Sequence, residues 1–373
     1  MALYIGLMSG TSLDGIDAVL VDFEPGHALV RTHRHAAFGG ALRAELLALN
    51  QAGPDELHRA ALAANQLARL SASLVASMVG ETNRHAVIAI GAHGQTVRHR
   101  PGEFDGCGYT VQIQNGALLA DLTGIDVVCD FRSADVAAGG QGAPLVPAFH
   151  SAMFGHAGED RAVLNLGGIA NLTLLAADGR VGGFDCGPAN LLLDAWCARH
   201  CGSAFDAGGA WAASGRAIDA LLAELLSEPF FALPSPKSTG RDLFSLEWLE
   251  RKLLAHAPAA APQDVQATLA ELTARSAADA LTAQAPRTTT LAVCGGGANN
   301  SHLMQRLRAQ LPTVRVGTTA QLHGLPVDQV EAAAFAWLAQ RFIGRVPGNI
   351  VGVTGARAPR VLGAFYPSAR PQP

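Results

Sequence analysis

Hydrophobic residues along the chain gather in short runs rich in Val, Ile and Leu, which alternate with longer segments of helical periodicity. Gly or Asp bounds the short runs, a pattern typical of β-strands. Six such runs lie in the first third of the chain, at residues 2–8, 18–23, 28–33, 86–92, 109–114 and 126–131. Residues 55–79 have the spacing of a helix that ends at Gly80. This mixture of strands and helices predicts an α/β fold.

The same pattern restarts at residue 161, where RAVLNLGGIANLTLLA reads as strand, Gly-rich turn and strand, and VGGFD adds a third strand. TTLAVC and TVRVG are further strand candidates. Helices are expected at residues 189–200, 264–284, 301–311 and 328–343. Asp328 and Glu331 are expected to form a capping box for the last helix. We expect the tail from residue 345, rich in Pro and Gly, to lie on the surface.

The strand–turn–strand motif therefore occurs twice, about 155 residues apart, near the N-terminal end of each half of the chain. A chain of 373 residues also exceeds the usual size of one hydrophobic core. These observations favour two domains, with a first lobe of residues 1–150 plus 330–373 and a second lobe of residues 151–329. The alternative is two ordinary hairpins in unrelated domains.

Composition excludes several classes of protein. Hydrophobic residues make up 49% and charged residues 16% of the chain, which suits a compact fold and argues against disorder. The net charge of −4 (27 − 31) and the lack of a basic run disfavour binding to nucleic acid or to an anionic membrane. We expect no signal peptide, and the sequence has no apolar run of the ~18 residues that a membrane span needs. We expect a soluble, cytoplasmic protein.

The six cysteines, at positions 107, 129, 186, 197, 201 and 294, form no CxxC pair and favour reduced thiols. Cys197, His200 and Cys201 share a predicted helix. Zinc would need a fourth ligand at a matching spacing, so buried helix positions are the better interpretation.

Glycine-rich turns are the first candidates for chemistry. In GLMSGTSLDGID, at residues 6–17, a turn of this composition can direct backbone N–H groups toward one phosphate. The candidate donors are Gly10, Thr11, Ser12 and Gly15. Gly167, Gly168 and Asn171, and the triplet Gly295, Gly296 and Gly297, could do the same in the second half. The chain has no P-loop, dinucleotide fingerprint, protein-kinase signature or GxSxG elbow.

The aspartates of the first turn have two interpretations. Asp14 and Asp17 could hold Mg²⁺ through water, because Mg²⁺ keeps much of its hydration shell. Alternatively, each stabilises the turn by accepting backbone hydrogen bonds. The sequence does not identify the metal ligands.

Asp185 ends an apolar strand, and Gly187 and Pro188 then break the chain before a helix. A carboxylate at the carboxyl end of a strand is where α/β enzymes tend to hold a catalytic group. Phosphoryl transfer often needs one base to orient the nucleophile, and Asp185 fits that role. The alternative is an N-cap for the following helix, a role that Asn190 could also fill.

Several motifs together resemble one family, the anhydro-N-acetylmuramic acid kinases. The motifs, in chain order, are GLMSGTSLDGID, GAHGQTVRH, VVCDFR, GGQGAPLVPAFH, LNLGGIANLTLL, GGFDCGPAN, PKSTGR, VQATLAELTA and CGGGANN. The resemblance covers effectively the whole chain. It implies the two-domain, actin-like ATPase (ribonuclease H-like) fold of the sugar kinase/Hsp70/actin superfamily, with an interdomain cleft.

The resemblance also implies a reaction. ATP, with Mg²⁺, phosphorylates O6 of 1,6-anhydro-N-acetylmuramic acid while water opens the anhydro bridge at C1, a step in recycling of bacterial cell-wall peptidoglycan. Asp185 matches the family's catalytic aspartate. The family's ATP-contacting segment matches Gly10, Thr11, Ser12, Leu13, Asp14, Gly15, Ile16 and Asp17.

For the sugar, GAHGQTVRHRP offers His93, Gln95, Thr96 and Arg98. His93 could equally serve only backbone groups. Arg132 is the candidate for the lactyl carboxylate, because a guanidinium binds a carboxylate through two parallel hydrogen bonds, and Gln141 is expected near the same pocket. The family usually has three arginines here, but Ser133 and Ala134 follow Arg132, so no further carboxylate partner is assigned.

Two rival functions remain open. One is an ordinary hexosamine kinase without ring opening, which the mass of the product would distinguish. The other is a nucleotide-driven binding module like actin or an Hsp70 ATPase domain, which predicts no sugar phosphate. The expected partners are the amino sugar and ATP, and a homodimer is a possible assembly.

Overall fold

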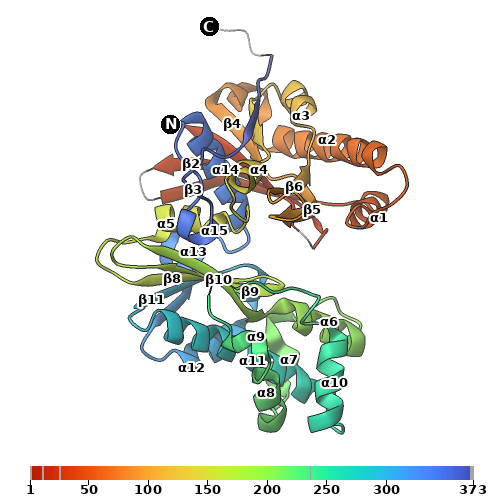
Figure 1. The fold of residues 1–373 in the computed structure, drawn as a ribbon, viewed down its shortest axis with the longest axis vertical. Helices are drawn as coiled ribbons and strands as arrows, with labels where there is room; N and C mark the ends of the chain where they lie inside the picture. The colour runs from red at the N-terminus through yellow and green to blue at the C-terminus, as the bar shows by residue number, and fades with distance from the viewer. Residues whose placement is uncertain (1, 11, 25–26, 236, 370–373) are drawn as a thin grey trace. The chain divides into compact units, whose positions relative to one another are not determined.

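The computed structural model describes residues 2–10, 12–24, 27–235 and 237–369. Its contacts divide the chain into two compact units, unit 1 with residues 1–153 and 329–373 and unit 2 with residues 154–328 (Figure 1). The chain thus enters unit 1, forms all of unit 2, and returns to unit 1. None of the described helices is both long and apolar enough to cross a lipid bilayer.

Unit 1 is built on a six-stranded sheet. Its strands are β1 (Leu3–Met8), β2 (Gly15–Glu24), β3 (His27–Ala37), β4 (Val87–Ala92), β7 (Val127–Cys129) and β13 (Ala364–Tyr366), in the order β13-β7-β4-β1-β2-β3. β1, β2 and β3 form an antiparallel meander, and β4 and β7 are parallel to β1. A separate ribbon pairs β5 (Gln95–Pro101) with β6 (Gly108–Ile113).

Unit 1 also contains helices. They are α1 (Gly40–Ala48), α2 (Glu56–Asn83), α3 (Gly116–Thr123), α4 (Ser133–Ala137), α5 (Val146–Phe154), α14 (Val330–Ile343) and α15 (Val351–Thr354), with a 3-10 turn, η1 (Arg84–Ala86). α2, α3 and α14 contact the sheet, while α1 and α4 contact the β5–β6 ribbon. The predicted helix of residues 55–79 is α2, whose regular geometry is interrupted at Gly80 (φ +43°, ψ 167°).

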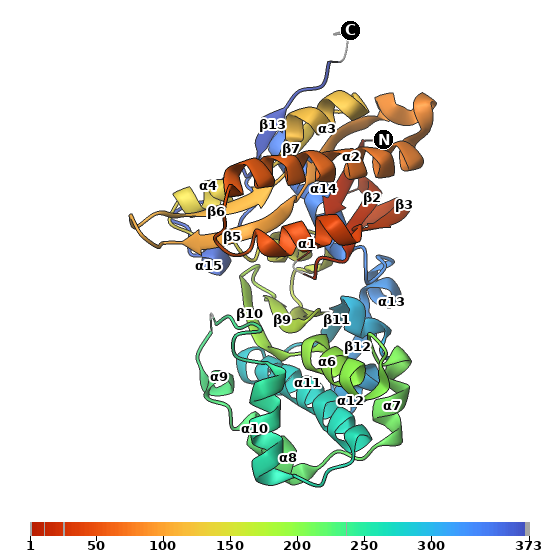
Figure 2. The same ribbon diagram turned by 90° about the vertical axis from the view of Figure 1, so that its right-hand side faces the viewer.

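The two faces of the unit 1 sheet bind different helices. Side chains alternate along a strand, so Ile5 and Leu7 of β1 point to the face where they cluster with Leu67 and Val75 of α2. Gly6, between them, points to the opposite face, where a Cβ would lie 1.8 Å from the backbone oxygen of Ala332 in α14. Glycine in β1 therefore lets the backbone of α14 lie directly on the sheet, and Figure 2 shows α2 and α14 on different sides of the strands.

Unit 2 contains a five-stranded sheet. Its strands are β8 (Arg161–Leu166), β9 (Ile169–Leu175), β10 (Val181–Pro188), β11 (Thr290–Cys294) and β12 (Arg315–Thr318), in the order β10-β9-β8-β11-β12. β8, β9 and β10 form an antiparallel meander, and β11 and β12 are parallel to β8.

The helices of unit 2 enclose a second core. They are α6 (Asn190–Cys201), α7 (Ala210–Ser214), α8 (Asp219–Leu226), α9 (Pro229–Ala232), α10 (Leu246–His256), α11 (Pro262–Gln284), α12 (Ser301–Gln310) and α13 (Thr319–His323), with 3-10 turns η2 (Ala207–Gly209) and η3 (Gly296–Asn299). α11 is the central helix, and most of its side chains from Val265 to Leu281 are buried against the strands and neighbouring helices, with Arg275 and Asp279 exposed.

The two sheets share one topology. In each, an antiparallel three-stranded meander is followed by two strands parallel to its first strand, so β3-β2-β1-β4-β7 corresponds to β10-β9-β8-β11-β12. Both glycine-rich turns join the first two strands of their meander. β13 adds an antiparallel edge strand to unit 1 alone. The topology is that of the predicted actin-like, ribonuclease H-like fold.

Three local predictions need correction. The N-cap residue of α14 is Gln329, without a side-chain cap hydrogen bond, so Asp328 and Glu331 form no capping box. The tail from residue 345 is only partly at the surface, because it forms α15 and β13 and buries Val353 and Leu362. The strand predicted at 18–23 begins earlier, at Gly15.

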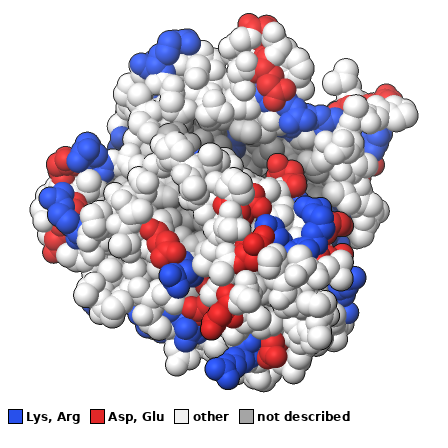
Figure 3. Space-filling view, turned by 60° about the horizontal axis from the view of Figure 1, so that its bottom comes forward, with Lys and Arg blue, Asp and Glu red and all other residues white. Residues whose placement is uncertain are grey.

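Charged groups of both signs are interspersed on the face of the molecule shown in Figure 3. The described cysteines are all free thiols; Cys107 and Cys201 are exposed and the other four are buried. Burial of this kind is common for reduced cysteines that act as small core residues.

Candidate active site

The first glycine-rich turn is hydrogen-bonded to the segment that follows β4. Ser9 Oγ donates to the carbonyl of Gly94 (2.9 Å), and Gln95 Nε2 donates to the carbonyl of Gly10 (3.1 Å). Leu13 takes a positive φ of 56°, and its N–H bonds the Gly10 carbonyl (3.3 Å). Thr11 lies outside the described residues. The predicted phosphate turn and the predicted sugar segment are thus joined directly.

Some side chains of the proposed ATP-binding segment cannot contact a ligand. Leu13 and Ile16 are buried in the core of unit 1, so only their backbones could reach a ligand. Gly15, Ile16 and Asp17 belong to β2 rather than to the turn. Ser12 and Asp14 are exposed, and Ser12 Oγ donates to Asp14 Oδ1 (2.8 Å).

His93 connects the turn to Arg132. Its Nδ1 lies 3.1 Å from the carbonyl of Ser9, and its Nε2 lies 2.9 Å from a terminal nitrogen of Arg132. A carbonyl only accepts and a guanidinium only donates, so Nδ1 carries the proton and Nε2 accepts. Burial, and then the charge of Arg132, lower the pKa of His93 to about 3, which keeps the ring neutral. Both ring nitrogens are engaged inside unit 1, which favours a supporting role over direct contact with sugar.

Arg132 is oriented by these contacts. Its Nε also donates to His93 Nε2 (3.3 Å), and a terminal nitrogen donates to the carbonyl of Gly142 (2.8 Å). Burial lowers the pKa of the guanidinium to about 10, while Glu331 and Asp135 act in the opposite direction, so it stays charged at neutral pH. Three of its five N–H groups are used in this way, which leaves one on each terminal nitrogen for a ligand.

The loop that carries Gln141 is fixed by a buried carboxylate. Asp135 is fully buried and accepts hydrogen bonds from the N–H of Gly142 (2.8 Å), Asn349 Nδ2 (2.6 Å) and Thr354 Oγ (2.7 Å). The N–H of Gln141 itself bonds the carbonyl of Thr354 (2.7 Å), and its side chain is exposed. Residues from the chain's return into unit 1 therefore hold the loop beside Arg132.

The β5–β6 ribbon carries amide and hydroxyl side chains that are partly or fully buried. Gln112 Nε2 donates to Thr96 Oγ (3.3 Å) and to Thr110 Oγ (2.8 Å). Gln95 is only 1% exposed, and its Oε1 has no hydrogen-bond partner among the described residues. A buried acceptor without a partner is costly, so Gln95 is suited to a donor on a ligand.

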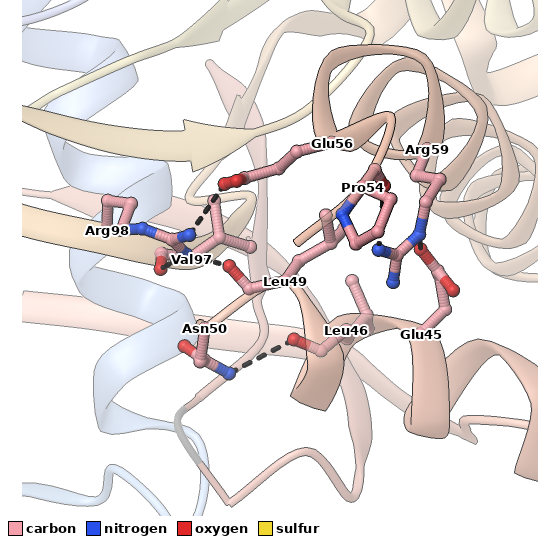
Figure 4. A network of polar contacts seen from close by, with 9 residues as sticks. All are labelled: Glu45, Leu46, Leu49, Asn50, Pro54, Glu56, Arg59, Val97 and Arg98. Carbon is pink, nitrogen blue, oxygen red and sulfur yellow. Dashed lines mark hydrogen bonds and ion pairs between the residues drawn. The ribbon is translucent and has the colours of Figure 1, made fainter. Parts of the chain in front are cut away.

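Arg98 has a structural role rather than the sugar contact considered from the sequence. Its guanidinium donates to Glu56 at 2.6 Å and to the carbonyl of Leu49, at the ends of α1 and α2 (Figure 4). Nearby, Arg59 binds Glu45 at 2.7 Å. These contacts fix the α1–α2 connection and take Arg98 out of the set of candidate sugar ligands.

Asp17 lies between two histidines of β3. Its Oδ1 is 3.2 Å from His33 Nε2 and 3.1 Å from His35 Nδ1. Among the residues described, no group of three His, Cys, Asp or Glu side chains is arranged to hold a metal ion. The Asp14 carboxylate is exposed.

In unit 2, the strand register places polar residues in one row. Asp185 of β10 is opposite Asn171 of β9, and Asn171 is also opposite Asn165 of β8, which in turn is opposite Cys294 of β11. The row ends beside the Gly295 triplet. The carbonyls of Gly167 and Gly168 accept hydrogen bonds from the N–H groups that begin α6, at 3.0–3.1 Å. The predicted residues of unit 2 therefore meet at one end of its sheet.

Asp185 is partly buried and held by one segment. Its Oδ2 accepts from Ser238 Oγ (3.0 Å) and from the N–H of Thr239 (3.0 Å). Burial raises the pKa of the carboxyl group above its usual range, and these two hydrogen bonds act in the opposite direction. The N-cap interpretation is wrong, since the N-cap residue of α6 is Ala189, and Asn190 donates to the carbonyl of Leu166 (3.0 Å) instead.

A cavity of about 400 Å³ lies beside the second glycine motif of unit 2. It is lined by Asn190, Leu193, Asp194, Phe205, Asp206, Gly208, Gly296, Asn299 and Asn300. Gly295 has a φ of +79°, and a Cβ on it would lie 2.3 Å from Asn165 Oδ1, so glycine is required there. Burial, and then the nearby Asp206, raise the pKa of Asp194 to about 6. The size, the exposed aromatic ring of Phe205 and the polar groups suit a nucleoside.

Sequence reasoning missed several of these residues. PKSTGR was quoted as a motif, yet nothing local indicated that Ser238 and Thr239 bind Asp185, 53 and 54 positions away. Asp194 and Asp206 carry no local signal of their own. Asp135 could have been suggested by its place as the one charged residue between two proposed sugar residues, Arg132 and Gln141.

The duplicated sheet topology, with a carboxylate on the third strand of the second sheet, defines a two-domain protein of the actin-like ATPase and sugar-kinase class. Within that class, the family model described as anhydro-N-acetylmuramic acid kinase matches residues 2–368, and the chain belongs to this family.

Named relatives agree with this assignment. The chain is 59% identical over 373 residues to an anhydro-N-acetylmuramic acid kinase of Variovorax paradoxus, covering 98% of this chain and 99% of the relative. It is 57% identical to that of Cupriavidus pinatubonensis, covering 98% of each. Among solved structures, a ROK family glucokinase from Streptomyces griseus with glucose and AMPPNP is 16% identical with a TM-score of 0.39, covering 91% of this chain and 99% of that one. A structural likeness of that strength says nothing about activity.

Proposed function

We propose that the protein is a kinase that uses ATP to phosphorylate O6 of 1,6-anhydro-N-acetylmuramic acid while water opens the 1,6-anhydro bridge. The products are N-acetylmuramic acid 6-phosphate and ADP, and the role is in recycling of cell-wall fragments. The observation that carries the proposal is membership of the family along the whole chain, with relatives of that name at 53–59% identity. Because the proposed reaction consumes ATP, we place the enzyme in the cytoplasm.

The chemistry needs one base. Water attacks C1 and gives a proton to Asp185, the C1–O6 bond breaks, and O6 forms a bond to the γ-phosphorus as the bond to ADP breaks. The phosphoryl group occupies the position of the general acid in ordinary glycoside hydrolysis. A single carboxylate with one oxygen fixed by Ser238 and Thr239 fits this role.

Each unit has its own part in the proposal. The turn from Ser9 to Asp14, with Gly167, Gly168 and the Gly295 triplet, would contact the phosphates, and the cavity beside Asp194 would take the nucleoside. Gln95, Thr96, Arg132 and Gln141 would bind the sugar. Mg²⁺ would supply charge neutralisation on the phosphates, held by ATP and water with Asp14 and Asp17 beside its hydration shell.

The mass of the product tests the function. Protein, ATP, Mg²⁺ and 1,6-anhydro-N-acetylmuramic acid are incubated, and the sugar product is weighed by mass spectrometry. We expect a gain of one phosphoryl group and one water. A gain of the phosphoryl group alone would identify an ordinary hexosamine kinase, and ATP turnover without a sugar phosphate would favour the binding-module alternative.

Arg132→Met is expected to raise the KM for the sugar by about 10²-fold, because two charge-assisted hydrogen bonds to the lactyl carboxylate are lost. The KM for ATP should stay within about threefold, since Arg132 lies outside the proposed nucleotide contacts. Steady-state kinetics measure both constants. Arg34→Met, at an exposed arginine of β3, is the matched control.

A second substrate tests whether Arg132 recognises the lactyl carboxylate of the sugar. 1,6-Anhydro-N-acetylglucosamine lacks the lactyl group, so wild-type protein and Arg132→Met should use it equally poorly. If Arg132→Met weakens binding of both sugars by the same factor, Arg132 does not recognise the carboxylate.

A further inference from the structure

The carboxylate of Asp185 is held by a short segment without helix or strand geometry, residues 237–239, which we call the strap. The N–H of Asp185 donates to the carbonyl of Lys237 (3.0 Å), while Ser238 Oγ and the N–H of Thr239 both donate to Oδ2 of Asp185 (3.0 Å each). In the part of the chain that the structure describes, Oδ1 of Asp185 has no hydrogen-bond partner. The strap therefore determines which oxygen is available as the base.

The strap is anchored by the side chain of its first residue. Lys237 Nζ donates to the carbonyls of Phe230 (3.0 Å) and Phe231 (2.9 Å), both in α9. The ammonium group also lies 4.6 Å from the centroid of the Phe230 ring, within the range of a cation–π contact. Phe230 is buried and packs edge-on against Phe244. The anchor point thus belongs to the core of unit 2.

We propose that Lys237 is a positioning residue for Asp185: by fixing the strap to α9, it keeps the two hydrogen bonds on Oδ2 and leaves Oδ1 free to take a proton from water. The proposal rests on the proposed role of Asp185 as the base. The hydrogen bonds of the Lys237 side chain go to α9, whereas those on the carboxylate come from Ser238 and Thr239. The effect of Lys237 passes through the strap.

The ammonium group of Lys237 is partly desolvated. Desolvation lowers the pKa of its ammonium group, so placing the charge there is unfavourable unless its donors are satisfied. Beside the ammonium lies a cavity of about 360 Å³, lined in part by Phe184, Cys186 and Ser276. The cavity gives room for the longer side chain of arginine in a Lys237→Arg variant.

Few titratable groups surround Asp185. The Cys186 thiol is adjacent in β10, and its pKa is raised by burial and by Asp185, so it stays neutral. Lys237 lies on the strap, and Asp279 of α11 lines the cavity next to it. Asn171 faces Asp185 from β9 and does not titrate. A change in the titration of Asp185 therefore reports mainly on the strap hydrogen bonds and on burial.

The test compares Lys237→Met with Lys237→Arg and with Lys252→Met. Methionine keeps an aliphatic stem but removes the donors, whereas arginine can still reach both carbonyls. Lys252 is a matched control, because it is a partly buried lysine of unit 2 that binds Glu224 (2.5 Å) and has no link to the strap. Thermal unfolding of each variant reports the structural effect separately.

For Lys237→Met we expect kcat to fall about 10²-fold, with the KM for each substrate within about threefold of wild type. Losing hydrogen bonds to the carboxylate should also raise its pKa, so the acid limb of the kcat–pH profile moves about one unit to higher pH. Ser238→Ala, which removes one of the two bonds without touching the anchor, should move the limb in the same direction. Lys237→Arg should restore the wild-type limb.

Two results would overturn the inference. In one, Lys237→Met keeps the wild-type acid limb and loses activity only in step with its thermal stability, as Lys252→Met does. In the other, Lys237→Arg shifts the limb as far as Lys237→Met. The Asp185 carboxyl can also be titrated directly by ¹³C NMR in wild-type protein and Lys237→Met. That readout does not depend on turnover, so it separates a failure of this inference from a failure of the proposed reaction.

Discussion

Asp185→Asn should lower kcat for the anhydro sugar by roughly 10³-fold or more, because the amide cannot accept the proton of the attacking water. Asparagine keeps the size of the side chain, and its oxygen can still accept from Ser238 and Thr239. The geometry of the strap should therefore survive. Binding of ATP, measured by isothermal titration calorimetry, is expected to stay within about threefold of wild type, since the nucleoside cavity does not include Asp185.

Asp178→Asn is the matched control for this variant. Asp178 is an exposed aspartate of the same unit, in the β9–β10 turn, where it binds Arg180 (2.8 Å). Its replacement should leave kcat unchanged. Near-normal turnover by Asp185→Asn would remove this carboxylate from the mechanism, and the base would have to be sought elsewhere.

Gly6→Ala is expected to lower the free energy of unfolding by about 3 kcal/mol or more, enough to unfold a marginal protein. A Cβ at this position would lie 1.8 Å from the backbone oxygen of Ala332 and 2.8 Å from the backbone nitrogen of Ala336. Backbone atoms inside a helix cannot rotate away, so α14 must move off the sheet. Urea denaturation followed by circular dichroism measures the loss as a lower midpoint.

Gly40→Ala provides the comparison. Gly40 is the first residue of α1, and an added Cβ meets nothing within 4 Å. Alanine also favours a helix over glycine, so this variant should be as stable as wild type or slightly more stable. A wild-type urea midpoint for Gly6→Ala would mean that α14 does not rest on β1 as described.

Much of the fold follows from the periodicity of the sequence. The strands before the glycine-rich turns were predictable because their buried apolar runs stop at or just before glycine: Gly167 follows β8, Gly295 follows β11, and Gly10 comes two residues after β1. β5 was missed as a strand because QTVRHRP carries three charged or titratable residues, and it pairs only with β6. β13 was missed because a three-residue strand gains its stability from pairing with β7, 235 or more positions earlier.

Some residues of the candidate site could likewise be suggested from the sequence, and others could not. Asp185 was a candidate because the sequence placed it at the end of an apolar strand; in the structure β10 continues through Gly187 to Pro188, so Asp185 lies within the strand. Arg132 was a candidate from the chemistry of the lactyl group, and the roles of both residues stay predictions. Arg98 shows the limit of such reasoning, because its position in a polar motif suggested a ligand, whereas the fold uses it to hold Glu56 and Leu49. Lys237 shows the opposite case, since its partners in α9 and β10 are set by tertiary packing, which composition and spacing do not encode.

Unit 1 is formed from two separate stretches of chain, and this has a consequence during translation. The ribosome releases β1 and β4 long before it has made α14, so the glycine-lined face of that sheet stays uncovered while 175 residues of unit 2 are synthesised. Unit 2 is continuous and can reach its native state first. A nascent chain halted before residue 330 would then carry all of unit 2 and a unit 1 whose sheet still lacks α14.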